Sequence, residues 1–137
     1  LTAQSGDAGG MTWAAAAGVS CKVGLFTKDT ADATGDQVIE SVGFTPKAIS
    51  IWGVVNGTAQ FSSGFYDGTT QGAQYNRHDN TANTWGLSTS HVMSLQQTSS
   101  IASLVAGKSL DSDGFTLTWT KNGAKTGTAN CAYLAIG

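Results

Sequence analysis

Hydrophobic and polar residues alternate along much of the chain, and no stretch keeps the period of about 3.6 residues that an amphipathic helix requires. The alternation is clearest from Phe115 to Thr120, where Phe115, Leu117 and Trp119 share one face and three threonines share the other. This pattern predicts a β-strand whose apolar face lies against a core. Trp119 is therefore expected to be buried.

The segment Lys47 to Gly53 repeats the alternation, with Ile49 and Ile51 on one face and Trp52 on the other. Pro46 stands directly before it, where a missing backbone N–H costs a strand least. The strand carries apolar residues on both faces. Trp52 is therefore expected to be a core residue as well.

By the same criteria, further strands are predicted at residues 21–27, 37–42, 60–66, 85–88, 92–95, 101–106 and 129–136. Asn122-Gly123 is a strong hairpin signal because both residue types accept positive φ, so residues 115–120 and 129–136 are expected to pair. Roughly eight to ten short strands separated by turns predict an all-β fold, either an antiparallel sandwich or a barrel.

The chain has 137 residues, which is the usual length of one domain. Leu1 to Gly10 is polar and Gly-rich. Residues 1–20 are therefore predicted to form an N-terminal arm or extension, and residues 21–137 the folded β-sandwich domain. Such an arm would become ordered on a neighbouring subunit.

Charged residues make up only 12% of the chain, about half the share usual in soluble proteins. A polar but weakly charged surface of this kind is common in secreted modules, lectins and virion proteins. The formal net charge is −2, and the basic residues are scattered singly, so the basic stripe typical of nucleic-acid binding is absent. The longest apolar stretch, Cys131 to Ile136, is far too short to span a membrane as a helix. Neither nucleic acid nor a membrane is expected as a partner.

The two cysteines, Cys21 and Cys131, are separated by most of the chain. A disulfide between them would close a very long loop and would stabilise the fold by about 4–5 kcal/mol in the chain-entropy description. The favoured interpretation is instead that both are small buried hydrophobic residues. Without suitably spaced histidines they do not make a zinc site.

Arg77-His78-Asp79 is the densest cluster of ionisable residues in the sequence. With Asp67 or His91 close in space, the cluster would supply an acid–base pair for a hydrolase. No G-x-S-x-G or H-E-x-x-H motif accompanies it, and an exposed loop with a local ion pair is the simpler interpretation. No catalytic residue is assigned, and the protein is predicted not to be an enzyme.

Asp111-Ser112-Asp113-Gly114 looks like the opening of a calcium loop. Such a loop needs further oxygen ligands and a distal Glu, because calcium takes six to eight oxygens. A strand begins here at once with Phe115, so the segment is predicted to be a polar turn. No metal ion and no other cofactor are expected.

Tyr75 and Trp85 flank the polar run from residue 76 to residue 83, and aromatic faces beside amide and carboxylate groups suit a sugar. The candidate ligand-binding residues are Tyr75, Arg77, His78, Asp79 and Trp85, gathered around one predicted polar loop. Packing within the domain and contacts between subunits remain the alternative roles for these residues.

Four further segments carry a resemblance to a known group of proteins. They are Val23-Gly24-Leu25-Phe26-Thr27, Val42-Gly43-Phe44-Thr45-Pro46-Lys47-Ala48, Asp111 to Leu117 with the wording D-S-D-G-F-T-L, and the ending Tyr133-Leu134-Ala135-Ile136-Gly137. Their order and wording over residues 21–137 resemble structural proteins of tailed bacteriophages and prophages. The resemblance implies an antiparallel β-sandwich, jelly-roll-like, that serves in the virion. It assigns no catalytic or ligand-binding residue.

The sequence and this resemblance together predict a non-enzymatic virion protein, in the first place a capsid decoration or cement protein that stabilises the shell. Its expected partners are the major capsid protein or other virion subunits, together with further copies of itself. The alternative is a carbohydrate-binding receptor-recognition module of a tail fibre, or a lectin. A hydrolase that uses Asp67, His78 or Asp79 ranks last.

Overall fold

The structure, a computed structural model of the whole chain, describes residues 3–7, 10–13, 18–57, 60–78 and 83–137, the first two segments through their backbone alone. The described residues form β-strands and no helix, which confirms the predicted all-β class. The strands are β1 (Ala3–Asp7), β2 (Gly10–Trp13), β3 (Cys21–Asp29), β4 (Gly35–Ile39), β5 (Ala48–Val55), β6 (Phe61–Tyr66), β7 (Gln71–His78), β8 (Asn83–Ser88), β9 (Met93–Gln96), β10 (Ala102–Asp111), β11 (Gly114–Asn122) and β12 (Thr128–Ile136).

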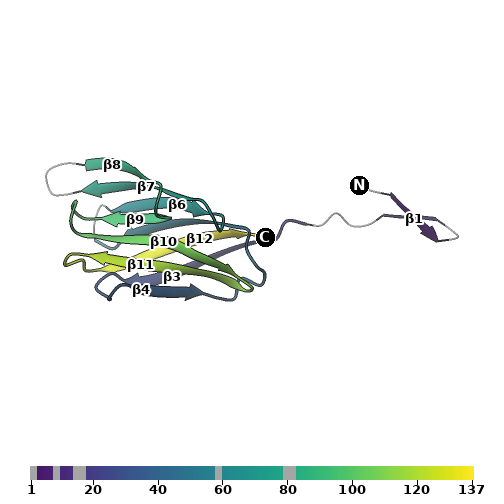
Figure 1. Cartoon of the computed structure of the whole chain (residues 1–137), viewed down its shortest axis with the longest axis horizontal. Coiled ribbons are helices and arrows are strands. Elements are labelled where there is room, and N and C mark those ends of the chain that lie inside the picture. The colour runs from purple at the N-terminus through teal and green to yellow at the C-terminus, as the bar shows by residue number, and fades with distance from the viewer. Residues whose placement is uncertain (1–2, 8–9, 14–17, 58–59, 79–82) are drawn as a thin grey trace.

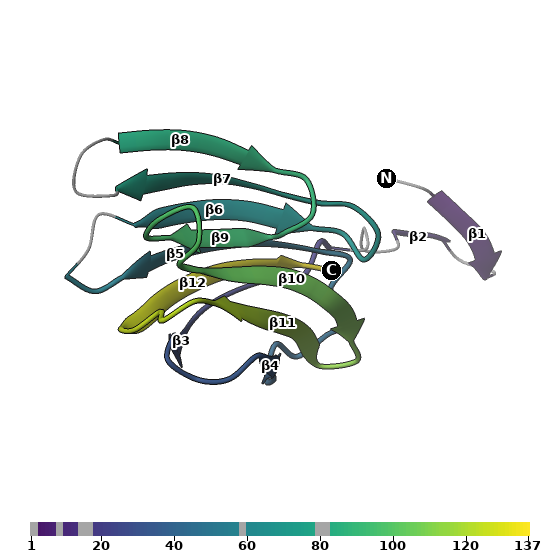
Figure 2. The same ribbon diagram turned by 60° about the vertical axis from the view of Figure 1, so that its left-hand side comes forward.

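Two antiparallel sheets form the body of the molecule (Figure 1). One has six strands in the order β3-β12-β5-β6-β7-β8, and the other has four in the order β4-β11-β10-β9. Figure 2 shows β9 and β10 in front of β5 and β12. The predicted β-sandwich is thereby confirmed. The strands β1 and β2 pair with each other in a sheet of their own, and the predicted arm over residues 1–20 stays a prediction.

The chain winds between the sheets in a partly jelly-roll-like way. The first two strands of the sandwich, β3 and β4, pair with its last two, β12 and β11, so these four strands are nested. The middle of the chain instead forms hairpins, β5 to β8 in one sheet and β9 to β11 in the other. The nested pairs bring sequence-distant strands together and close the sandwich around one core.

The core lies between the sheets and is made of the inward residues, which alternate with outward ones along each strand. Phe115, Leu117 and Trp119 are all nearly inaccessible, as their shared face predicts. Phe115 packs edge-on against Tyr133 of the other sheet, with ring centroids 5.1 Å apart. Ile51 is completely buried on the inner face of β5. The strands at 47–53 and 115–120 therefore face the core as predicted.

The predicted hairpin at Asn122-Gly123 is wrong. Gly123 does adopt a positive φ of 66°, as the sequence suggests. The chain then crosses from the four-stranded to the six-stranded sheet, so that β11 pairs with β10 and β4 while β12 pairs with β3 and β5. The crossover buries Lys125 completely, and its ammonium donates a hydrogen bond to the side-chain oxygen of Gln60. A local turn signal thus marks a bend without deciding which strand comes next in the sheet.

Two further expectations need correction. The polar run from residue 76 was interpreted as part of a loop, but β7 extends through His78 and was not predicted. Trp52 was expected in the core, but its side chain is 41% exposed on the outer face of β5. The β7 segment is largely polar and nevertheless forms a strand, and Trp52 is apolar and nevertheless exposed. Hydrophobicity alone therefore predicted neither correctly.

Three of the four segments that carry the sequence resemblance meet in space at one end of the sandwich. The backbone N–H of Val42 donates to the Asp113 carbonyl oxygen at 3.1 Å, and that of Gly43 donates to Asp113 Oδ1 at 2.5 Å. The backbone N–H of Lys47 donates to the carbonyl oxygen of Ile136 at 2.7 Å. Asp111 to Gly114 is therefore a structural turn that holds the loop before β5, as predicted.

The cysteines are both free thiols. In the registers of β12, Cys21 lies beside Ile136, whereas Cys131 lies beside Phe26. Five residues of strand separate these positions, about 16 Å at about 3.3 Å per residue, which exceeds the span of a disulfide. Cys131 is buried as expected, but Cys21 is exposed, so the expectation that both are buried is wrong for Cys21.

Candidate functional site

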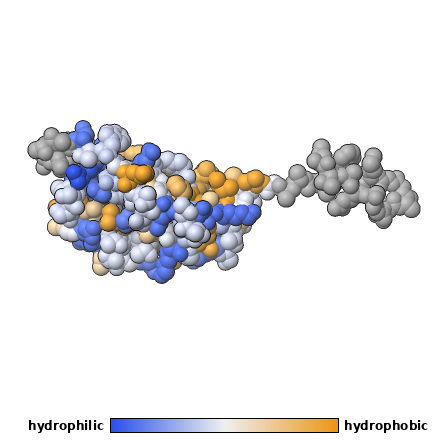
Figure 3. All heavy atoms as spheres, turned by 45° about the horizontal axis from the view of Figure 1, so that its top comes forward, coloured by the Kyte–Doolittle hydropathy of each residue, from blue (hydrophilic) through white to orange (hydrophobic). Residues whose placement is uncertain are grey.

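The outer face of the six-stranded sheet is the most unusual surface of the described part of the molecule. Among the described residues, all exposed large hydrophobic side chains except Val19 and Val38 project from this face. They are Val23, Leu25, Trp52, Val54, Phe61, Phe65, Trp85, Leu87 and Ile136. Figure 3 shows hydrophobic residues, in orange, reaching the surface of the sandwich in several groups. We call this surface the outer apolar face.

Strand register arranges the face in rows that cross the sheet. One row runs through Leu25, Ala132, Trp52, Ser63, Gln74 and Leu87. A second runs through Thr27, Asn130, Val54, Phe61, Asn76 and Trp85, and a third through Val23, Leu134, Ser50, Phe65 and Gly72. Directly paired side chains on one face of a sheet lie close enough to contact one another. The rows therefore act as one continuous surface over all six strands.

Charge is almost absent from this surface. Among the outward side chains that the structure describes on the six strands, the charged one is Asp29, at the very end of β3. The polar positions between the hydrophobic ones hold Ser, Thr, Asn or Gln. Depletion of charge together with aromatic enrichment distinguishes the centres of protein interfaces from ordinary surface.

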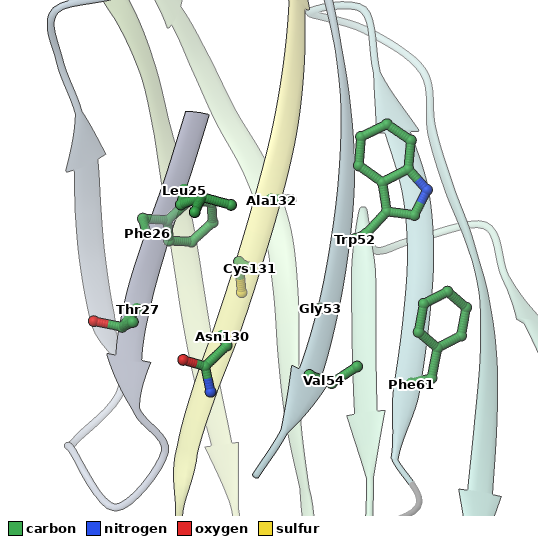
Figure 4. A pocket seen from close by; sticks show the side chains of 10 residues that line it. All are labelled: Leu25, Phe26, Thr27, Trp52, Gly53, Val54, Phe61, Asn130, Cys131 and Ala132. Atoms are coloured by element: carbon green, nitrogen blue, oxygen red, sulfur yellow. The ribbon is translucent and has the colours of Figure 1, made fainter. Parts of the chain in front are cut away.

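A groove of about 340 Å³ crosses the face between β3 and β6 (Figure 4). Leu25 stands on one side, and Trp52 and Phe61 stand on the other. The floor is low because Ala132 contributes only a methyl group between these walls, and the backbone at Gly53 lies beside it. Gly53 cannot be larger, since a Cβ there would lie 2.2 Å from the sulfur of Met93 beneath the sheet.

A second hollow, of about 280 Å³, lies on the other side of Trp52. Phe65 and Leu87 contribute to its walls, and Ser63 and Gln74 supply polar groups. Trp52 therefore forms a ridge between two depressions. The outer apolar face has relief as well as hydrophobicity.

The sequence-predicted ligand residues do not gather on this one face. Trp85 is 75% exposed and belongs to the outer apolar face. Tyr75 and Arg77 point to the opposite side of β7, where the Tyr75 ring covers Gly86 so closely that a Cβ on Gly86 would lie 2.3 Å from it. His78 ends β7 and pairs with Asn83, and its side chain lies outside the described atoms.

Asp79 lies outside the described residues altogether. Whether any of the five residues binds a ligand stays a prediction. The structure nevertheless divides them between two sides of the sheet, because residues that follow each other in a strand alternate in direction. One polar loop no longer describes their arrangement.

The other ionisable groups that were considered for catalysis have local structural roles. Ser88 Oγ lies 2.9 Å from His91 Nδ1 in the turn after β8, and burial lowers the pKa of His91. Asp67 accepts hydrogen bonds from the backbone N–H groups of Thr70 and Thr69, which lower the pKa of its carboxyl group. Within the described residues, His91 has no carboxylate partner that would orient it as a general base.

The described residues contain no group of three or more His, Cys, Asp or Glu side chains placed to hold a metal ion. In the same part of the chain, no helix has the length and hydropathy needed to cross a membrane.

Comparison with known proteins leaves the site to be interpreted from its own geometry. No family, no curated protein and no solved structure matches this chain.

Sequence reasoning did not identify the outer apolar face as a site, although a signal for it exists. Val23 and Leu25 alternate with Lys22 and Gly24, and Phe61 and Phe65 alternate with serines. Each of these patterns also suits a strand whose hydrophobic residues point inward. Only the presence of two opposite apolar faces on β5 hinted that this sheet exposes hydrophobic residues.

Proposed function

We propose that this protein is a non-enzymatic structural component of a tailed-phage virion, in the first place a capsid decoration protein that stabilises the shell. The observation that carries the proposal is the outer apolar face. The largest apolar patch on a typical monomer measures about 300–600 Å² and is itself often functional. Here exposed hydrophobic side chains project from five strands of the six-stranded sheet, β7 contributing none at its described positions.

Two other features support an assembly role. Charged residues are only 12% of the chain, so association between copies or with a shell meets little charge repulsion. Several ionisable side chains have structural roles, such as Asp67 in a turn and the Lys28–Asp32 ion pair, at 2.6 Å. A decoration protein acts by mass action, because binding only the assembled shell shifts the equilibrium toward it.

The proposal is tested by mixing the full chain with empty capsids of tailed phages, pelleting the particles and heating them. We expect stoichiometric co-sedimentation and a raised temperature of capsid disruption. Bovine serum albumin at the same concentration serves as the non-binding control. Absence of both co-sedimentation and thermal protection with every capsid tested would remove the decoration role.

A second function, carbohydrate recognition by a tail fibre or lectin, is favoured by one observation. The hollow beside Trp52 combines aromatic walls with the polar side chains of Ser63 and Gln74, and Trp85 stands exposed in the neighbouring row. Sugars stack on aromatic rings while their hydroxyl groups bond to such polar groups. A glycan array, repeated with Trp85→Ala and Trp52→Ala, tests this role. Specific binding that both substitutions abolish would support it, and an array without hits would end it.

A further inference from the structure

The two surfaces of the six-stranded sheet are built alike. The inner surface is covered by the four-stranded sheet, in the face-to-face packing that places sheets about 10 Å apart. The outer surface also carries aliphatic and aromatic side chains, such as Trp52 and Val54 on β5 and Phe61 and Phe65 on β6, with polar side chains between them. A second sheet could pack on the outer surface by the same physical rule.

The relief of the outer apolar face suits interdigitation with a similar surface. In the row from Leu25 to Leu87, the small residues Ala132 and Ser63 lie on either side of Trp52, and Gln74 lies between Ser63 and Leu87. Alternation of large and small residues across facing positions lets two packed layers fill each other's hollows. The two hollows beside the Trp52 ridge accordingly offer space for projecting side chains of a second layer.

The size of the face matches one half of an ordinary stable interface. Six strands about 4.8 Å apart and about eight residues long cover about 600 Å² in projection, and the accessible area of an uneven surface exceeds its projection. Stable interfaces bury about 800 Å² on each partner. One face of one sheet is therefore large enough to hold two chains together without help from the rest of the molecule.

The charge pattern favours the chain itself as the occupant. A two-fold contact brings the same patch of both partners together, so any charge near its centre would meet its own copy. The described centre of the outer apolar face carries none, and the net charge of the whole chain is only −2. An interface with a differently charged partner would instead be expected to carry charges of the complementary sign.

We propose that the outer apolar face is covered by a second copy of this chain, with the two six-stranded sheets packed face to face about a two-fold axis. The free protein is then a dimer of four stacked sheets. The inference concerns the protein in solution and holds whether or not the dimer decorates a shell.

The test is the mass of the full chain in solution, measured by sedimentation velocity from nanomolar to high micromolar concentration. We expect a species of twice 14.0 kDa at micromolar concentration. The double substitution Leu25→Glu/Leu87→Glu places four carboxylates in the interface and should weaken dimerisation by at least about a hundredfold. Leu25 is 84% exposed and Leu87 69% exposed within the monomer, so neither substitution removes a core contact.

Val38→Glu is the matched control, because Val38 is exposed on β4 of the other sheet and should leave the dimer unchanged. Circular dichroism and thermal unfolding verify that all variants are folded. A second reading comes from acrylamide quenching of tryptophan fluorescence. Trp52 and Trp85 should become protected as the concentration rises, while Trp119, already buried in the monomer, should not change.

Three results would overturn the inference. They are a 14.0 kDa species at all concentrations, a dimer equally insensitive to both kinds of substitution, and open-ended association beyond the dimer. A monomer that binds capsids through the outer apolar face would assign the face to the shell, overturning the dimer while leaving the proposed function in place. A dimer that binds no capsid would support the dimer and contradict the decoration role.

Discussion

The outer faces of the two sheets differ sharply, although both cover the same core. On the four-stranded sheet, Thr116 and Thr118 of β11 bond to carboxylates, Thr116 Oγ1 to Asp111 Oδ2 and Thr118 Oγ1 to Asp36 Oδ1, each at 2.7 Å. Asp36 also forms an ion pair with Lys108. On the six-stranded sheet, exposed leucine, valine, phenylalanine and tryptophan side chains stand among uncharged polar ones.

This difference shows which surface the fold needs and which it does not. A sandwich is stabilised by the two inner faces, so the outer faces are free to be polar. The four-stranded sheet has a polar outer face suited to water. The six-stranded sheet has a more apolar one, which is costly for a free monomer and which marks this face as the candidate binding surface.

The largest change in the free energy of unfolding is expected from substitutions on the inner side of the six-stranded sheet, compared with substitutions on its outer side. Ile51→Ala, on the inner side of β5, should lower the free energy of unfolding by about 2–5 kcal/mol because it leaves a cavity in a closed core. Leu25→Ala, on the outer side, should change it by less than about 0.5 kcal/mol at concentrations where the chain is monomeric. Urea unfolding measures both. Equal losses would mean that the outer face is already packed within one chain, and the contrast would fail.

Lys125 provides the next test, because it buries a charge in the crossover between the sheets. Burial lowers the pKa of Lys125 from 10.5 to about 8. Between these values the unfolded chain binds the additional proton, so the contribution of Lys125 to the free energy of unfolding should rise as the pH increases from about 8 to about 10.5, by on the order of 2–3 kcal/mol.

Lys125→Met should remove this rise. The comparison between the two proteins is essential, because burial raises the pKa of Cys131 to about 12 and the unfolded thiol ionises first, which lowers stability at high pH in both. Urea unfolding across this pH range gives the difference. Identical pH profiles for the two proteins would show that Lys125 is not desolvated in the fold.

Thiol reactivity sharpens the contrast between the outer and the inner side of the six-stranded sheet. Cys21 is exposed, whereas Cys131 is buried with a pKa raised to about 12, so its reactive thiolate is scarce. One thiol per folded chain should react with a maleimide at least about a hundredfold faster than the other. Cys21→Ser should eliminate the fast phase, and urea should expose the second thiol. Two equally fast thiols would contradict the burial of Cys131.

The smallest effect concerns the polar face of the four-stranded sheet. The hydrogen bonds from Lys108 and then Thr118 hold the pKa of Asp36 below its usual value. The stability that this carboxylate contributes is present above its unfolded pKa and is lost as the pH falls through the folded one. Lys108→Met should raise the pKa of Asp36, measured by NMR titration, while Lys28→Met should leave it unchanged. An Asp36 pKa that Lys108→Met leaves unchanged would show that the ion pair with Lys108 does not lower it.

Much of the fold was accessible from local pattern. The alternation in Phe115 to Thr120 assigned the inner face of a central strand, because a strand has a period of two whatever its neighbours are. The alternation in Lys47 to Gly53 separated the two faces of β5 without deciding which of them is buried. The missed strand, β7, lacks that signal. Its sequence from Gln71 to His78 is mainly polar, and its pairing with β6 and β8 rather than its own hydrophobicity keeps it in the sheet.

The candidate site was accessible only in part. Trp85 was named as a candidate ligand residue because it flanks a polar run in the sequence, with packing as the alternative, and the structure exposes it. Trp52 was assigned to the core, because an apolar residue in an apolar strand suggests burial on either face. Tyr75 and Arg77 were grouped with Trp85 because they are close in the sequence. Because directions alternate along a strand, they lie on the side of the sheet opposite to Trp85.

By itself, the amino-acid sequence determined the all-β class, the positions of most strands and the inward face of those whose two sides differ in polarity. These properties are local, since alternation, turn residues and β-branched content act within a few residues. Only the tertiary structure decided that the chain crosses to the other sheet after β11, that β12 lies between β3 and β5, and that one sheet exposes its second apolar face. Those properties depend on contacts between residues far apart in the chain, and the same alternating pattern is compatible with either face being buried.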